Sequence, residues 1–414
     1  MTARLSIVDY IRPLRLACAV ARCGSAVAAA GVLHLSQSSV TRAVQGLERV
    51  IGASLFDRVG HGMSPTAVGE ALSLRTQRAL VLLAQADPFA RKILPGQAIG
   101  WVGSRLASNL GGRHLRALLA LEQCGSESAA AAMLGISQSA VHQTLAELEH
   151  MVGSALFHRA RKGLRATEAC EPIVRACKLA RSEWLQASDE IASLHGQHQG
   201  RLVIGTLPFS TGTLLAQTVD QVLREQPGLH ISIIDGTFDA LVHQLRHAAI
   251  DLLVGALRPT APGPDLHQQT LFQDRLAVVV RAGHPLARRR ALAWRDLHDA
   301  AWVMPMPHTP AQAAFEQALQ AAGLSVPADT LRVNSALMMQ AMLAQSDRLA
   351  LMSPRQVERE IAAGLLVQLP LEVQHAPRRI GLIRRGDFLP TASAQLVLDT
   401  LAGVAGRIDA QFRA

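Results

Sequence analysis

Two short polar runs in the first half of the chain carry side chains that hydrogen-bond nucleic acids. They are Ser36, Gln37, Ser38, Thr41 and Arg42 in the first run, and Ser137, Gln138, Ser139, His142 and Gln143 in the second. Gln and Arg reach base edges in the DNA major groove, and Ser and Thr bond either phosphate or base. Within each run these residues fall on one side of a helical repeat, which predicts a helix with a short polar outer face.

Both runs belong to an internal repeat. Shifting the chain by 101 residues aligns Leu14–Thr66 (copy one) on Leu115–Thr167 (copy two) without a gap. About 22 of the 53 aligned positions are identical. Because the unit is too long and occurs too few times for a solenoid, the repeat predicts a duplicated domain.

Each copy predicts three helices followed by a hairpin. Ser25 and Ser126 cap an Ala-rich second helix, and Ser36 and Ser137 cap a third helix whose apolar residues recur at i, i+4 and i+7. The hairpin that follows contains Gly and carries cations, which are Arg58 in copy one and Arg159, Arg161 and Lys162 in copy two. A helix, a turn and a polar-faced helix beside a basic hairpin favour a module that places its third helix in a major groove. A protein-interaction module with a merely solvated polar face is the alternative.

Charge distribution favours the same interpretation. The net charge of the chain is +9. Residues 1–199 hold 21 Lys and Arg against 14 Asp and Glu, whereas residues 200–414 hold 20 against 18. Positive charge therefore concentrates in the half that contains the repeat, as expected where a polyanion is bound.

Both copies resemble the winged helix-turn-helix of LysR-type transcriptional regulators. The resemblance rests on Gly-Ser, Ala-Ala, Ser-Gln-x-x-Val, Leu-Glu, Gly, Leu-Phe-x-Arg and Thr at fixed spacing. Copy one keeps Thr41-Arg42 where the family has Ser-Arg, whereas copy two has His142-Gln143 there. One such domain per chain is usual in the family, so the tandem arrangement is a departure that leaves open which copy dominates DNA binding.

From Gly200 onward, strands and helices alternate, which predicts an α/β fold with parallel sheets. Ligands of such sheets bind beyond the carboxyl ends of the strands. This half resembles the two-lobed, periplasmic-binding-protein-like effector domain of LysR-type regulators, and in particular the subgroup that regulates aromatic-acid and sugar-uptake operons. The resemblance implies a small organic effector, such as an organic acid, held by Phe209, Ser210, Thr211, Thr237, Arg258, His308, Thr309 and Ser335. Ser210 and Thr237 acting only as helix caps is the alternative.

Residues 171–194 predict a long amphipathic helix. Its apolar stripe has no evident partner in either neighbouring domain, so we expect it to join two chains into a homodimer, or further into a homotetramer. The expected domains are a first winged helix-turn-helix at 10–70, a helix and connector at 71–112, a second winged helix-turn-helix at 113–170, a linker helix at 171–199 and an effector domain at 200–411. Within the last, lobe one is expected at about 201–270 and 384–411, and lobe two at about 271–383.

The sequence disfavours other functions. It lacks nucleophile-elbow, phosphate-loop, zinc-helix and dinucleotide-binding motifs, so no enzyme, cofactor or metal site is expected. Five cysteines without a CxxC motif and no long apolar run favour a cytoplasmic protein with free thiols, and the family resemblance implies a bacterial one. A thiol redox sensor, or a DNA-binding regulator without a functional effector site, is the alternative. Operator DNA and the effector are the expected partners, and RNA polymerase is a candidate partner.

Overall fold

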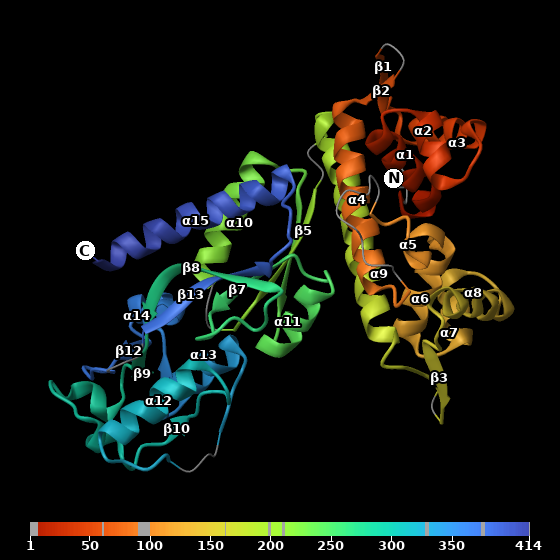
Figure 1. The fold of residues 1–414 in the computed structure, drawn as a ribbon. Coiled ribbons are helices and arrows are strands. Elements are labelled where there is room, and N and C mark those ends of the chain that lie inside the picture. Colours follow the sequence, from red (N-terminus) through yellow and green to blue (C-terminus); the bar gives the residue numbers. More distant parts are fainter. Residues whose placement is uncertain are drawn as a thin grey trace. The chain divides into compact units, whose positions relative to one another are not determined.

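The computed structural model describes residues 7–59, 62–89, 100–161, 163–197, 200–208, 212–327, 331–373 and 377–413. The chain divides into two compact units, Met1–Gly200 and Arg201–Ala414. In Figure 1 the first runs from red to yellow-green and the second from green to blue. Each unit contains its own hydrophobic clusters and is described separately.

The two copies in the first unit fold alike. Copy one forms α1 (Ile11–Cys23), α2 (Ala26–Leu33), α3 (Gln37–Ile51), β1 (Phe56–Val59) and β2 (Gly62–Pro65). Copy two forms α6 (Gly112–Cys124), α7 (Glu127–Leu134), α8 (Gln138–Val152), β3 (Phe157–Ala160) and β4 (Gly163–Ala166). Every boundary in copy two lies 101 residues after its counterpart. The three helices and the antiparallel hairpin, called the wing below, are as predicted.

Caps and a left-handed glycine set the turns of each copy. Ser25 and Ser126 accept hydrogen bonds of 3.2 Å from backbone N–H groups in the first turns of α2 and α7. Gly24 and Gly125 end the preceding helices at φ of 71° and 66°, a conformation that favours glycine. Their carbonyls then accept the N–H of Met63 and of Leu164 in the wings. Each wing is therefore attached to the turn between the first two helices.

The predicted linker helix has a partner within its own chain. It is α9 (Cys170–Leu194), and it packs against α4 (Ala67–Ala86), the helix that follows copy one. One hydrophobic cluster extends from Ile7 to Ile191 and includes both copies and both long helices. The expectation that the apolar stripe of α9 lacks a partner is therefore wrong, because the sequence pattern shows a stripe but not what covers it.

One buried carboxylate joins the end of α4 to residues 104–106. Asp87 accepts hydrogen bonds from the Ser104 hydroxyl, at 2.6 Å, and from the Leu106 backbone N–H, at 2.9 Å. These contacts begin the short helix α5 (Arg105–Asn109). A short 3-10 turn, η1 (Ile7–Tyr10), precedes copy one.

A five-stranded sheet of the second unit has the order β6-β5-β7-β13-β8. Its strands are β5 (Arg201–Thr206), β6 (His230–Asp235), β7 (Leu252–Ala256), β8 (Leu266–Arg275) and β13 (Pro377–Arg385). Alternate residues of β5 face two clusters. One cluster includes α10 (Gly212–Glu225) and α15 (Ala392–Arg413), and the other includes α11 (Phe238–Arg246). Helices therefore cover both faces of this sheet.

A four-stranded sheet of the second unit has the order β10-β11-β9-β12. Its strands are β9 (Ala277–Arg281), β10 (Trp302–Val303), β11 (Leu349–Met352) and β12 (Leu366–Gln368). The helix α12 (Pro310–Ala321) packs on one face and α13 (Ala336–Gln345) on the other. The remaining short elements are η2 (Pro285–Arg288), η3 (Trp294–Leu297), η4 (Pro354–Val357) and α14 (Glu358–Ala362).

Both sheets differ from the sequence prediction in two respects. They are mixed rather than parallel, because β13 runs antiparallel to β7 and β9 runs antiparallel to β11. In addition, β8 and β13 both belong to the five-stranded sheet. The chain therefore passes between the sheets after Arg275 and before Pro377, rather than at 270 and 384.

Within the described ranges, no single helix is both long and apolar enough to cross a membrane. The segments Ile7–Cys23 and Ala26–Leu33 pass that test only when they are counted together across a bend of 116°.

Candidate nucleic-acid interface and effector site

The helix α3 presents the first polar run on an exposed face. Val40, Val44 and Leu47 are buried in the core, so the register of the helix is fixed. Ser36 caps the helix by accepting the Ser39 N–H. The Arg42 side chain is exposed, and its Nε donates to the Ser38 carbonyl at 3.2 Å, which directs the guanidinium along the helix surface. Gln37 and Ser38 are exposed and Thr41 is partly exposed on the same helix.

The helix α8 presents the second run in the same way but with different chemistry. Val141, Leu145 and Leu148 are buried. Ser137, at the cap, and Gln138, Ser139, His142 and Gln143 are exposed. The carboxylate of Glu127, on α7, contacts two of these side chains. It lies 3.0 Å from His142 Nδ1 and accepts a 3.4 Å hydrogen bond from Gln138.

Glu127 is a residue that sequence reasoning missed. The hydrogen bond with His142 is the main reason that the pKa of Glu127 lies below its usual value, and the charge of Arg159 lowers it further. Copy one has Ala26 at the equivalent position, so this carboxylate is specific to copy two. Comparing the two copies position by position would have found it as an acidic substitution beside a basic wing.

The wings place basic side chains at the surface. Arg58 in copy one, and Arg159 and Arg161 in copy two, are exposed. Lys162 lies outside the described residues. Exposed arginines on a hairpin beside a polar-faced helix can contact the phosphates that flank a groove.

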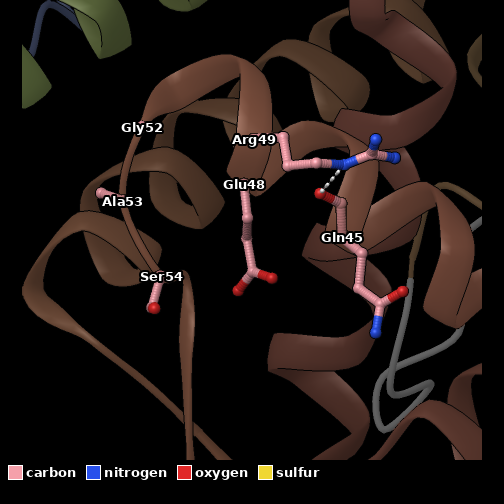
Figure 2. A pocket seen from close by; sticks show the side chains of 6 residues that line it. All are labelled: Gln45, Glu48, Arg49, Gly52, Ala53 and Ser54. Atoms are coloured by element: carbon pink, nitrogen blue, oxygen red, sulfur yellow. Dashed lines mark hydrogen bonds between the residues drawn. The ribbon is translucent and has the colours of Figure 1, made fainter.

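The Leu-Glu pair of each copy has a structural role. Glu48 and Glu149, at the ends of α3 and α8, accept the backbone N–H of Leu55 and of Leu156, each at 2.8 Å. Figure 2 shows Glu48 in an open depression lined by Gln45, Glu48, Arg49, Gly52, Ala53 and Ser54. Arg49 Nε donates to the Gln45 carbonyl there. Since local backbone groups already engage these side chains, we assign the depression no ligand.

In the second unit, the structure brings two predicted effector residues to one sheet edge. The parallel register aligns Thr206 with Asp235 and with Val254, so β6, β5 and β7 end together. Thr237 follows β6 and Arg258 follows β7. The Arg258 guanidinium lies 4.2 Å from the ring centroid of Phe238, the residue after Thr237.

Among the described residues, Thr237 makes no helix cap and Arg258 forms no ion pair with a carboxylate. Thr237 is exposed, and its hydroxyl makes no capping hydrogen bond to α11, so helix capping is not what its side chain does. Burial is the main cause that lowers the pKa of Arg258 below its ordinary value, and the charge of Asp239 partly opposes this shift. Among the described residues, no carboxylate forms an ion pair with Arg258.

The other predicted effector residues either lie outside the described residues or make local hydrogen bonds at helix starts. Phe209, Ser210 and Thr211 lie outside the described residues. Thr309 caps α12, and its hydroxyl both donates to the Met306 carbonyl and accepts the Gln312 N–H. Ser335 caps α13, and the His308 N–H donates to Gln312. Helix capping therefore accounts for Thr309 and Ser335 without a ligand.

Comparisons with known proteins identify the family. Residues 195–406 match the family described as LysR substrate binding domain, and residues 11–70 and 112–171 each match the bacterial regulatory helix-turn-helix protein of the lysR family. The chain belongs to the LysR family of bacterial transcriptional regulators. It is 31% identical over 375 residues to the HTH-type transcriptional regulator GalR of Pseudomonas putida, which covers 91% of this chain and 92% of the relative. It is 28% identical over 298 residues to PcaQ of Agrobacterium fabrum, covering 72% of this chain and 95% of the relative.

Solved LysR-family structures agree on the fold. A full-length OxyR variant from Pseudomonas aeruginosa superimposes with a TM-score of 0.51 at 20% identity, covering 71% of this chain and 93% of its own. Full-length LysG from Corynebacterium glutamicum, with bound effector Arg, gives 0.50 at 23% identity, covering 71% and 97%. This LysR-family chain is therefore a DNA-binding transcriptional regulator that carries an effector-binding domain.

Four of the five thiols of this LysR-family regulator do not favour redox sensing. Burial raises the pKa of Cys18, Cys170 and Cys177 to about 12, so these thiols stay protonated at neutral pH. The pKa of Cys23 is also raised, mainly by burial. A sensor thiol needs the opposite shift.

Proposed function

We propose that α3 and α8 are the recognition helices of two winged helix-turn-helix domains and enter major grooves of operator DNA. The base-reading residues are Ser36, Gln37, Ser38, Thr41 and Arg42 in copy one, and Ser137, Gln138, Ser139, His142 and Gln143 in copy two. Arg58, Arg159, Arg161 and Lys162 of the wings bind phosphates. One observation carries the proposal: both helices bury one apolar stripe and expose these polar residues at positions that differ by 101.

Two substitutions separate base reading from phosphate binding. Arg42→Ala should relax sequence preference at one position, because an arginine fork discriminates guanine from other bases. Arg161→Ala should weaken binding to all duplexes alike and lower the slope of log K against log salt by roughly one. Titration of the full chain with specific and scrambled duplexes at several salt concentrations measures both effects. Failure of the wild-type chain to bind any duplex at low salt would refute the proposal.

We further propose that a small organic acid binds the second unit between two lobes built on its two sheets. Arg258 would pair with the carboxylate, and Thr237 and the residues that follow β5, namely Phe209, Ser210 and Thr211, would add contacts. His308, Thr309 and Ser335 would close the site from the second lobe. The half-buried Arg258, which has no carboxylate partner among the described residues, supports an anionic ligand because a buried cation is stabilised by pairing.

A thermal-shift screen of carboxylic acids on the full chain tests this site. A true effector should raise the melting temperature of the wild-type chain, and the rise should vanish in Arg258→Ala and in Thr237→Val. Arg224→Ala is the matched control, since Arg224 forms only an exposed pair with Asp220 on α10. A full shift retained in both site variants would place the ligand elsewhere. If no acid shifted the wild-type chain, the alternative of a regulator without a functional effector site would hold.

Association into a homodimer or homotetramer, and contact with RNA polymerase, stay predictions. The apolar stripe of α9 no longer supports the first, because α4 of the same chain covers it.

A further inference from the structure

Reciprocal contacts relate the two copies within the first unit. Arg15 on α1 donates from Nη2 to the Leu110 carbonyl at 2.7 Å. Its repeat counterpart, Arg116 on α6, pairs with Asp9. Since Arg116 follows Arg15 by 101 residues and Leu110 follows Asp9 by 101 residues, the two contacts join the same pair of repeat positions in both directions, one through a backbone carbonyl and one through a carboxylate. A contact of i with j that recurs as a contact of j with i is the mark of a two-fold interface.

The long helices obey the same two-fold relation. Arg75 of α4 lies 3.1 Å from Glu183 and 2.5 Å from Glu190 of α9, whereas Arg78, further along α4, pairs with Glu183. Advancing along α4 therefore means going back along α9, so the two helices are antiparallel (Figure 1). The two copies have the same two-fold relation, because α1 packs on α4 as α6 packs on α9. Likewise η1, which precedes copy one, packs on α9, and α5, which precedes copy two, packs on α4.

This arrangement supplies within one chain what a symmetric dimer supplies with two. Antiparallel equivalent helices place the two wings at opposite ends of the α4–α9 pair, as Figure 1 shows for β1–β2 and β3. The helices α3 and α8 then have opposite orientations, which is how a two-fold pair reads two inverted half-sites. Because one polypeptide and one hydrophobic cluster join the copies, their association does not depend on protein concentration.

The two faces are not the same, although the interface between them is symmetric. Arg42 in α3 corresponds to Gln143 in α8, and Thr41 corresponds to His142. Arginine favours guanine, whereas glutamine favours adenine. Glu127, which contacts the polar face of α8 only, increases the difference. A dimer of identical chains that each used the same recognition helix would read a palindrome. The two recognition helices of one chain differ, so they match two unlike half-sites.

We infer that a single chain is the complete DNA-reading unit, and that its target is an asymmetric duplex site made of two unlike half-sites, one for α3 and one for α8. The inference rests on the proposed recognition faces, but it adds how many chains read one site and what the site looks like.

Complementation between chains tests this inference. Arg42→Ala and Gln143→Ala occupy equivalent positions in the two copies, so each is the matched control of the other. The duplex is first selected from a random pool with the full wild-type chain and then footprinted. Each variant should lose protection over a different half-site and bind on the order of tenfold or more weakly. Circular dichroism of both variants, which change exposed side chains, should match the wild type.

Mixing the two variants decides the question. If each chain reads both half-sites, an equimolar mixture of Arg42→Ala and Gln143→Ala chains holds no fully intact reader, and protection of both half-sites together should not return. Restored wild-type protection in the mixture would mean that two chains each contribute one copy, and would overturn the inference while leaving the recognition faces intact. Selection of a palindrome would also overturn it. Failure of the wild-type chain to bind any duplex would overturn the proposed function itself and this inference with it.

Discussion

Replacing the buried Arg75 should loosen the contact that holds the two copies together. The Arg75 side chain is 0% exposed, and its guanidinium contacts Glu183, Gln186 and Glu190 of α9. Although burial opposes it, the charges and hydrogen bonds of Glu190 and Glu183 raise the pKa of Arg75 above its ordinary value. Arg75→Ala leaves a 10%-exposed Glu183 and a partly buried Glu190 without this partner.

The cost follows from the environment of the pair. Removing one partner of a buried ion pair costs about 3 to 5 kcal/mol, and we expect about 3 kcal/mol because Arg78 still pairs with Glu183 at 2.9 Å. For a unit of this size, that corresponds to a melting temperature lower by about 6 to 12 °C. Arg78→Ala is the control: this side chain is 26% exposed, and its loss should cost about 1 kcal/mol or less.

Scanning calorimetry of the full chain measures both variants. Only the transition of the first unit should move, since Arg75 lies in Met1–Gly200. A shift in Arg75→Ala no larger than that in Arg78→Ala would refute the reasoning, because α4 and α9 would then not be joined through this buried cation.

Four further predictions concern the copies. Glu127→Ala should raise the affinity for duplex several-fold, because it frees His142 and Gln138 and removes one negative charge near the phosphates. Titration at constant salt measures this effect. Because the pKa of Glu127 is lowered in the folded chain, its contribution to stability is present above the ordinary carboxylate pKa and is lost as pH falls through the lowered value; in Glu127→Ala this part of the acid dependence of unfolding should disappear. Gly69→Ala should destabilise the junction of wing and α4, because a Cβ there would lie 2.0 Å from the Leu55 carbonyl oxygen, and thermal unfolding checks it. Inserting five base pairs, about half a helical turn, between the half-sites should abolish their joint protection in a footprint, whereas two independently mobile copies would keep it.

Local sequence signals predicted the first unit well. Ser25, Ser36, Ser126 and Ser137 cap the helices as expected, and the long helix expected from residue 171 to 194 is α9, Cys170–Leu194. These features depend on neighbouring residues, so the sequence carries them directly. What covers the stripe of α9 depends on a helix about 100 residues away. Arg75 is buried in that contact, but an arginine in the sequence does not mark the buried face of a helix, so α4 was not identified as the partner of α9.

The second unit shows where such signals stop. Strand β8 has a weak sequence signal, because Leu266–Arg275 holds few apolar residues and buries only some of them. The lobe boundaries expected at about 270 and 384 fall inside β8 and inside its neighbour β13, Pro377–Arg385. At the candidate effector edge, Thr237 and Arg258 were expected, but Phe238, which stacks under Arg258, was not. Contacts between side chains from different strands require the sheet order, and the sequence pattern alone does not supply it.

Methylation interference at guanine N7 on the selected duplex tests the central claim most directly, because N7 lies in the major groove. With the wild-type chain, we expect interference in two segments of the duplex that have unlike sequences. With the Arg42→Ala variant, only the segment read by α3 should disappear, and the segment read by α8 should remain. Interference in a single segment, or in two segments of the same sequence, would contradict the claim that one chain reads DNA with both α3 and α8.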